Sequence, residues 1–142
     1  MALYRYDPAT KAVTRLHFPE KLSFIHPEPG YAASLESVVF SSNAKRMAIV
    51  VEGVKKSERE NEPDHSRRAC YSAEIEASGA RLIHQTEPDA GKLYPAWSHN
   101  GRRLVILDSS GNAPSLFVYN YDGTGKRMAP LPTEQAEPSA TH

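Results

Sequence analysis

The chain has 142 residues, of which 39% are hydrophobic and 24% are charged, the composition of a globular protein with a core of its own. Its 17 basic residues balance 17 acidic ones, so the formal net charge is zero. No long-range positive field is expected to attract nucleic acid or an anionic membrane, and we expect neither as a partner. No run of about 18 apolar residues is present, which excludes a helical membrane span.

The first elements in chain order form an expected hairpin over residues 1–16. Leu3–Tyr6 has the aromatic residues of a strand, residues 8–11 favour a turn, and residues 12–16 complete the pair. Of Tyr4 and Tyr6, one is expected to pack and the other to face solvent or a neighbouring sheet, and the same is expected of Tyr119 and Tyr121. Residues 17–33 contain Pro and Gly and predict a loop, with one short strand at residues 22–25.

An internal repeat follows this loop. Residues 39–50 read Val-Phe-Ser-Ser-Asn-Ala-Lys-Arg-Met-Ala-Ile-Val, and residues 96–107 read Ala-Trp-Ser-His-Asn-Gly-Arg-Arg-Leu-Val-Ile-Leu, at a constant offset of 57. An aromatic residue, a Ser, an Asn, a basic pair and an apolar run recur at matching positions. The pattern predicts two β-hairpins whose second strands are buried on both faces. Asn100-Gly101 is the stronger turn signal, because Ala44 tolerates a positive φ poorly.

Each of these hairpins is followed by a second pair of strands. Residues 69–76 and 80–84 form the first such pair, and residues 115–122 and 127–131 form the second, each joined by a short turn. The hairpin at residues 1–16 resembles both of them. Between the second and third strands of the first unit, residues 54–68 carry many charges of both signs. We expect a long solvated loop there, or a recognition loop at the rim.

At these residues the sequence resembles the TolB-like, PD40-type (WD40-like) β-propeller repeat. The resemblance rests on the segments 95–104 and 118–123, and the Pro-Asp that the family has in its turn is replaced by Ser42-Asn43 and His99-Asn100. It implies an all-β fold of propeller blades. Two four-stranded antiparallel blades would span residues 34–87 and 93–132, beside the outer hairpin 1–16, and residues 133–142 would be a disordered tail.

Two blades and a hairpin cannot close a ring, because propellers need about four blades or more. We expect a fragment of a longer propeller, or a chain that completes itself as a homo-oligomer. The chain starts without a signal peptide. A cytoplasmic location is expected for a full-length chain, and a periplasmic one for a fragment of a TolB-type precursor.

The sequence predicts no catalytic residue, cofactor or metal site. It lacks a Gly-x-Ser-x-Gly elbow, a P-loop and a dinucleotide fingerprint, and its six histidines have no ligand spacing. Cys70, the single cysteine, is expected to be an inert thiol in a strand. Trp97 is expected to anchor one sheet on the next. For Asp89 and Asp108 we expect turn capping, with a cation site as the alternative.

The resemblance therefore implies a non-catalytic module that presents its loops to a protein or peptide partner, or to the remaining blades of a propeller. The alternative is the N-terminal propeller of a prolyl-oligopeptidase-like serine peptidase, which gates substrate access and contains no catalytic residue itself. The candidate partner-contact residues are His99 and Asn100 at the second hairpin turn, and His65, Arg67 and Arg68 in the charged stretch.

Overall fold

The structure is a computed structural model that describes residues 3–16, 30–75, 79–89 and 91–131. The expected short strand at residues 22–25 and the expected tail at residues 133–142 lie outside this part. Within it the protein is all-β, as predicted, and no helix that could cross a membrane is found there. The ten strands are β1 (Leu3–Tyr6), β2 (Val13–Leu16), β3 (Ala32–Phe40), β4 (Arg46–Lys55), β5 (His65–Glu74), β6 (Ala80–Gln85), β7 (Leu93–Trp97), β8 (Arg103–Asp108), β9 (Ser115–Asn120) and β10 (Arg127–Ala129).

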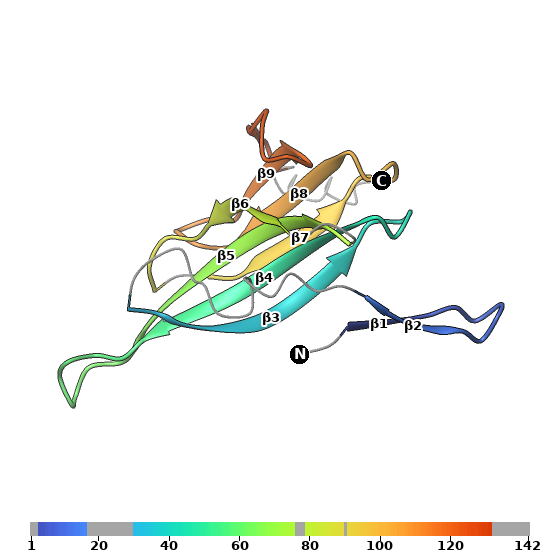
Figure 1. The fold of residues 1–142 in the computed structure, drawn as a ribbon. Helices are drawn as coiled ribbons and strands as arrows, with labels where there is room; N and C mark the ends of the chain where they lie inside the picture. Colours follow the sequence, from blue (N-terminus) through green and yellow to red (C-terminus); the bar gives the residue numbers. More distant parts are fainter. Residues whose placement is uncertain (1–2, 17–29, 76–78, 90, 132–142) are drawn as a thin grey trace, which may run out of the picture.

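The strands form three antiparallel sheets in chain order. The first sheet has the order β3-β4-β5-β6, the second sheet has the order β7-β8-β9-β10, and β1 pairs with β2 alone. Each four-stranded sheet is a meander in which every strand pairs with its neighbour in sequence. In Figure 1 the second sheet lies behind the first, and the β1–β2 hairpin projects away from both. Strand β7, the first strand of the second sheet, contacts β3, β4 and β5 of the first sheet.

The core lies on both faces of the first sheet. Met47, Ile49 and Val51 face one side of β4, whereas Ala48 and Val50 face the other, and all five are almost fully buried. The expectation of a strand buried on both faces is therefore confirmed for β4, but it is wrong for β8, where Leu104 and Ile106 are buried and Val105 and Leu107 are only half-buried. Side chains of the second sheet cover the Ala48 side together with Cys70 of β5; these are Leu93, Leu104, Ile106 and Tyr119.

The two hairpin turns that the repeat predicts are present and make the same hydrogen bonds. In the first turn, Ser41 Oγ donates to Asn43 Oδ1 over 2.7 Å, and the Lys45 N–H donates to the same oxygen over 3.1 Å. The second turn repeats these bonds between Ser98 Oγ and Asn100 Oδ1 (2.8 Å), and between the Arg102 N–H and Asn100 Oδ1 (3.0 Å). Ala44, at φ 55°, takes the left-handed conformation that Gly101 takes at φ 68°. The sequence with the weaker turn signal thus forms the same turn, but the Cβ of Ala44 makes its left-handed backbone conformation less favourable than that of Gly101.

The strand pairing also repeats between the two sheets. Phe40 pairs with Met47 at the end of the first hairpin, and Trp97 pairs with Leu104 at the matching position of the second. The Trp97 indole N–H donates to the Val39 carbonyl over 2.9 Å, so this ring joins β7 to β3. The expectation that Trp97 anchors one sheet on the other is confirmed.

The β1–β2 hairpin differs from the two outer strand pairs that it resembles in sequence. The difference is not in the length of the connection, since Tyr6 pairs with Val13 across six residues and Ala73 of β5 pairs with Ala80 of β6 across six as well. Tyr4 and Tyr6 are 60% and 59% exposed, so the expectation that one of them packs is wrong. Residues two apart lie on the same face of a strand, and no described residue covers this face. The expectation is confirmed for the other pair, because Tyr119 is 3% exposed and Tyr121 is 39% exposed.

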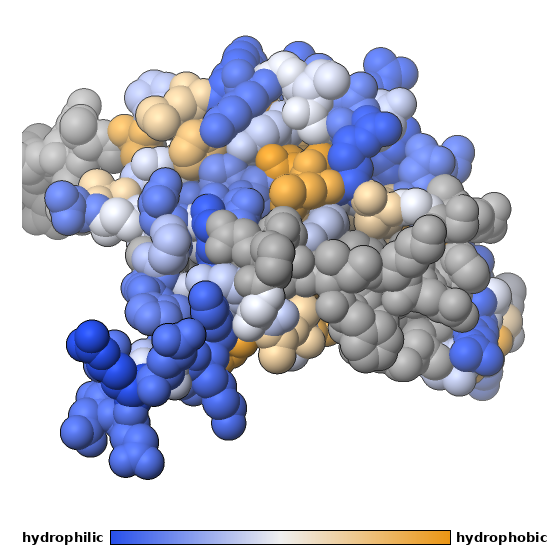
Figure 2. Space-filling view, turned by 60° about the vertical axis from the view of Figure 1, so that its left-hand side comes forward, coloured by the Kyte–Doolittle hydropathy of each residue, from blue (hydrophilic) through white to orange (hydrophobic). Residues whose placement is uncertain are grey.

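The charged stretch at residues 54–68 is a loop only in its middle. Strand β4 continues to Lys55 and β5 starts at His65, with these two residues paired, so the predicted loop is wrong at both ends. The extension is stable because the charges of β5 find partners on its neighbours; Arg68, for example, is 3.1 Å from Glu52 of β4. The remaining loop, residues 56–64, forms the hydrophilic projection at the lower left of Figure 2.

Candidate functional site

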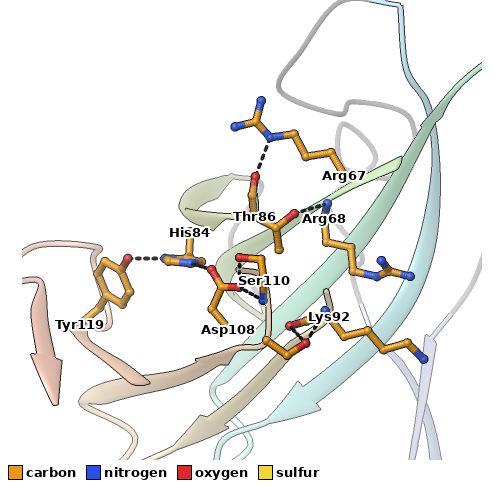
Figure 3. A network of polar contacts seen from close by, with 9 residues as sticks. Arg67, Arg68, His84, Thr86, Lys92, Asp108, Ser110 and Tyr119 are labelled. Atoms are coloured by element: carbon orange, nitrogen blue, oxygen red, sulfur yellow. Dashed lines mark hydrogen bonds and ion pairs between the residues drawn. The ribbon is translucent and has the colours of Figure 1, made fainter. Parts of the chain in front are cut away.

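A buried polar network joins the two four-stranded sheets (Figure 3). His84 of β6 places Nε2 2.6 Å from Asp108 Oδ2 and Nδ1 2.6 Å from the Tyr119 hydroxyl. Asp108 ends β8 and accepts the Ser110 N–H at 2.8 Å, so the turn capping expected of it is confirmed. The Ser110 hydroxyl is a further hydrogen-bond partner of the same carboxylate. One tautomer satisfies the ring, with Nε2–H donating to Asp108 and Nδ1 accepting from Tyr119.

The network controls the ionisation of its members. Burial is the largest single effect on Asp108 and favours the neutral acid, but the hydrogen bonds from His84 and Ser110 outweigh it and lower the pKa of this carboxyl. Burial, with smaller contributions from Cys70 and Asp108, raises the pKa of Tyr119 to about 12. The phenol therefore stays neutral and the carboxylate stays charged over the physiological pH range.

These groups have the chemistry of a proton relay, but they are closed to substrates. His84 is 7% exposed, Asp108 6% and Tyr119 3%. The Phe117 ring packs against the His84 ring, with 4.6 Å between the two ring centroids. We therefore interpret the network as a link that fixes one sheet on the other. Sequence reasoning missed it, since nothing in the spacing of His84 and Tyr119 indicates a contact between them.

Two predicted contact residues, Arg67 and Arg68, are used inside the protein. Arg67 Nε donates to the Thr86 carbonyl over 2.7 Å. Arg68 reaches Glu36 at 2.8 Å, Glu52 at 3.1 Å and the Gly91 carbonyl at 2.8 Å. These contacts tie β5 to β3, β4 and the segment that precedes β7. The side chain of Arg68 is 13% exposed, so little of its guanidinium is left for a partner.

His65 lies at the start of β5 and contacts Asp89. Its Nδ1 is 2.7 Å from Asp89 Oδ2, while Asp89 Oδ1 accepts the Ser66 N–H at 2.9 Å. The hydrogen bond with His65 has the largest effect on the pKa of Asp89 and lowers it, and the bond from the Ser66 N–H lowers it further. Asp89 thus holds the beginning of β5, which lies 23 residues earlier in the chain, instead of capping its own turn as expected. Both side chains are about half exposed, at 48% and 49%.

The other two predicted contact residues, His99 and Asn100, lie at the opposite end of the sheets. Arg46 pairs with Glu74 at one end of the β4–β5 ladder and Lys55 pairs with His65 at the other. The β3–β4 and β7–β8 turns meet at the Arg46 end, where the Ser42 hydroxyl donates to the His99 carbonyl. The structure therefore does not bring the predicted contact residues together, and places them in two separate surfaces.

The surface at the Arg46 end contains a groove, here called the turn-end groove. Turns of both four-stranded sheets line it, together with the turn that follows β9. Ser72 Oγ of β5 donates to the Tyr121 carbonyl over 2.8 Å, and the Tyr121 N–H donates to the Arg102 carbonyl over 2.9 Å, which fixes this third turn against β5 and the β7–β8 turn. The lining residues are Asn43, Lys45, Arg46, Asn100, Arg102, Asn120, Tyr121 and Asp122.

Arg46 lines the groove and is held there by two neighbours. Its guanidinium carbon lies 3.7 Å from the centroid of the Tyr121 ring, a cation–π arrangement. Its Nη1 donates to the Gly101 carbonyl over 2.8 Å. The nearest carboxylate among the described residues is that of Glu74, at 3.9 Å from Nη2, and the buried Nε has no acceptor there. The positive charge is therefore held in place but only weakly compensated.

Metal and thiol chemistry find no support in the described part of the chain. No group of three His, Cys, Asp or Glu side chains able to hold a metal ion is found among the residues outside the gaps. Cys70 is 0% exposed, and burial raises the pKa of its thiol to about 12. A protonated and inaccessible thiol does not act as a nucleophile, in agreement with the inert role expected of Cys70.

Comparison with known proteins finds no matching family model, no matching curated protein and no matching solved structure.

Proposed function

We propose that this protein is a non-catalytic module that binds a peptide segment of a partner protein, and that the turn-end groove is its binding surface. The observation that carries this proposal is that turns distant in sequence build one open groove on a rigid base. Recognition surfaces are commonly formed by loops that a β-scaffold positions. The polar network with the relay-like chemistry, by contrast, is buried between the sheets.

The rigidity of the groove supports a binding role. Its turns are fixed by their own side-chain caps and by bonds between sheets, such as that of Ser42 to the His99 carbonyl. A surface that is ordered before binding loses little conformational entropy when a ligand arrives. The same groove includes Asn100, one of the residues predicted from the sequence, and lies beside His99.

We also propose that the two four-stranded sheets are TolB-like propeller blades. This assignment is supported by the two meanders of four strands, by the repeated turn bonds and by the contact of β7 with the first sheet. In this reading the exposed β1–β2 hairpin is an outer strand pair whose inner strands come from a further part of a longer propeller. A two-stranded hairpin alone is marginally stable in water, which favours a partner for it.

The test is a selection of random peptides on the immobilised protein, followed by binding measurements on the enriched sequences. Two double variants locate the site: Lys45→Ala with Arg102→Ala in the groove, and Lys56→Ala with Arg59→Ala in the β4–β5 loop. Each removes two positive charges. We expect the groove variant to lose binding and the loop variant to keep it. No enriched peptide, or loss of binding in the loop variant alone, would refute the proposal.

A further inference from the structure

Two asparagines of the turn-end groove, Asn43 and Asn100, present hydrogen-bond donors. Asn43 and Asn100 each turn the amide oxygen inward, where it accepts the backbone N–H of Lys45 or Arg102. A backbone N–H only donates, so the orientation of both amides is fixed by these bonds. Their NH₂ groups have no acceptor among the described residues. The internal repeat therefore places two equivalent amide donors side by side in one groove.

Three cationic side chains add to these donors. Lys45, Arg46 and Arg102 all line the groove, and Glu74, 3.9 Å from Arg46, is the one carboxylate paired with any of them in the described part of the chain. Asp122 is the one acidic member of the lining, and its Oδ1 accepts the N–H and the hydroxyl of Thr124 at 3.0 and 2.6 Å, so three cations stand against one carboxylate in the lining. The groove thus carries a local excess of positive charge in a chain whose formal net charge is zero.

The guanidinium of Arg46 is held in one position before any ligand binds. The Tyr121 ring and the Gly101 carbonyl fix its guanidinium, so a bound carboxylate would not have to order a mobile side chain. Charge-assisted hydrogen bonds from guanidinium and ammonium groups to carboxylate are the stronger class of hydrogen bond. A site that offers donors and cations together therefore selects an acceptor that is negatively charged.

We infer that the turn-end groove binds an acidic peptide, whose Asp or Glu carboxylates accept from Lys45, Arg46, Arg102 and the two Asn amides. This inference rests on the proposed function and names the ligand class for the same groove. A peptide fits better than a nucleic acid, because Asp122 lines the groove and Glu74 lies 3.9 Å from Arg46, and both carboxylates would repel a continuous row of phosphates. Peptide carboxylates are spaced by neutral backbone and can avoid both.

The experiment measures fluorescence polarisation of a labelled ten-residue peptide rich in Asp and Glu, and of its matched peptide with Asn and Gln in their place. The protein variants are Lys45→Glu with Arg102→Glu, and, as a control with the same change of charge, Lys56→Glu with Arg59→Glu in the β4–β5 loop. Thermal unfolding of each variant checks that it remains folded. A single-stranded oligonucleotide of similar length is measured in parallel.

We expect the acidic peptide to bind at least about tenfold more tightly than the neutral one, a difference of about 1.4 kcal/mol. The groove variant should lose at least about tenfold in affinity, and the control variant should stay within about twofold. Raising the salt concentration should weaken binding, since the Debye length falls from about 10 Å at 0.1 M to about 3 Å at 1 M.

Equal binding of both peptides, or tighter binding of the oligonucleotide, overturns the acidic-peptide inference. The proposed function survives that result when the random selection still yields peptides whose binding depends on the groove. When neither the designed peptides nor the selected ones bind, both the inference and the proposed function fail.

Discussion

Replacing Tyr119 by Phe removes one hydroxyl from the buried network and keeps the ring. The hydroxyl is 2.6 Å from His84 Nδ1, and Tyr119 is 3% exposed, so no solvent is expected to take its place. His84 would be left with a buried acceptor that has lost its donor. An unsatisfied buried polar group costs about 1–3 kcal/mol, so we expect Tyr119→Phe to lower the free energy of unfolding by about 2 kcal/mol.

Urea unfolding measures this change as a shift of the midpoint at constant slope. The matched control is Tyr94→Phe, because Tyr94 is 54% exposed and its loss of a hydroxyl should change stability by less than about 0.5 kcal/mol. If both variants unfold at the same urea concentration, the buried network does not stabilise the contact between the two sheets.

The same variant has a signature at alkaline pH. The pKa of Tyr119 is about 12 in the folded protein, whereas a free tyrosine titrates near pH 10. The contribution of the neutral phenol to stability is therefore full below about pH 10 and is lost as the pH rises from there through the folded pKa. Tyr119→Phe should remove this part of the alkaline loss. An unchanged alkaline profile would show that Tyr119 does not titrate differently in the two states.

Three further predictions concern other buried or strained groups. Ala44→Gly should stabilise the protein by about 0.5–1 kcal/mol, because it relieves a positive φ. Gly101→Ala should destabilise it by at least about 1 kcal/mol, because the new Cβ would lie 3.3 Å from the Cβ of Ser41. If the urea midpoints of both variants move in the same direction, the two turns do not share one geometry. Cys70 should resist a water-soluble disulfide reagent in the native protein and react fully in urea, and rapid native labelling would show that the sheets open. Hydrogen bonds lower the pKa of Asp108, so the ionised carboxylate contributes to the free energy of unfolding above about pH 4, and this contribution is lost as the pH falls through the folded pKa. The free energy of unfolding of Asp108→Asn should therefore fall less than that of the unaltered protein when the pH is lowered from 6.

Local sequence patterns predicted most of the strands and the two hairpin turns. Ser, Asn and a residue able to take positive φ are enough to form such a turn within six residues, so Ser98 to Arg103 could be interpreted without knowing the rest of the chain. The same reasoning failed at residues 54–68, where charge density indicated a loop. The strand reaches further there because Arg68 finds carboxylate partners in Glu52 of β4 and Glu36 of β3, and such partners cannot be seen in a local window.

The candidate groove was predicted only in part. Asn100 was identified at its turn, but Lys45, Arg46 and Arg102 were interpreted as part of a fold pattern. The signal was present, since the basic pair recurs after each Asn at the offset of 57 residues. What was missing was the knowledge that the two turns lie side by side, which follows from the packing of the second sheet on the first.

The sequence by itself determined the all-β class, the hairpin turns and the burial of β4 on both faces, because a continuous apolar run and the backbone needs of a turn are both visible within a few residues. Only the tertiary structure decided that His84 meets Tyr119, which is 35 residues away, and that Arg46 lies over Tyr121. These contacts depend on how two sheet faces fit together. That fit depends on the shapes of many side chains at once and leaves no periodic trace in the sequence.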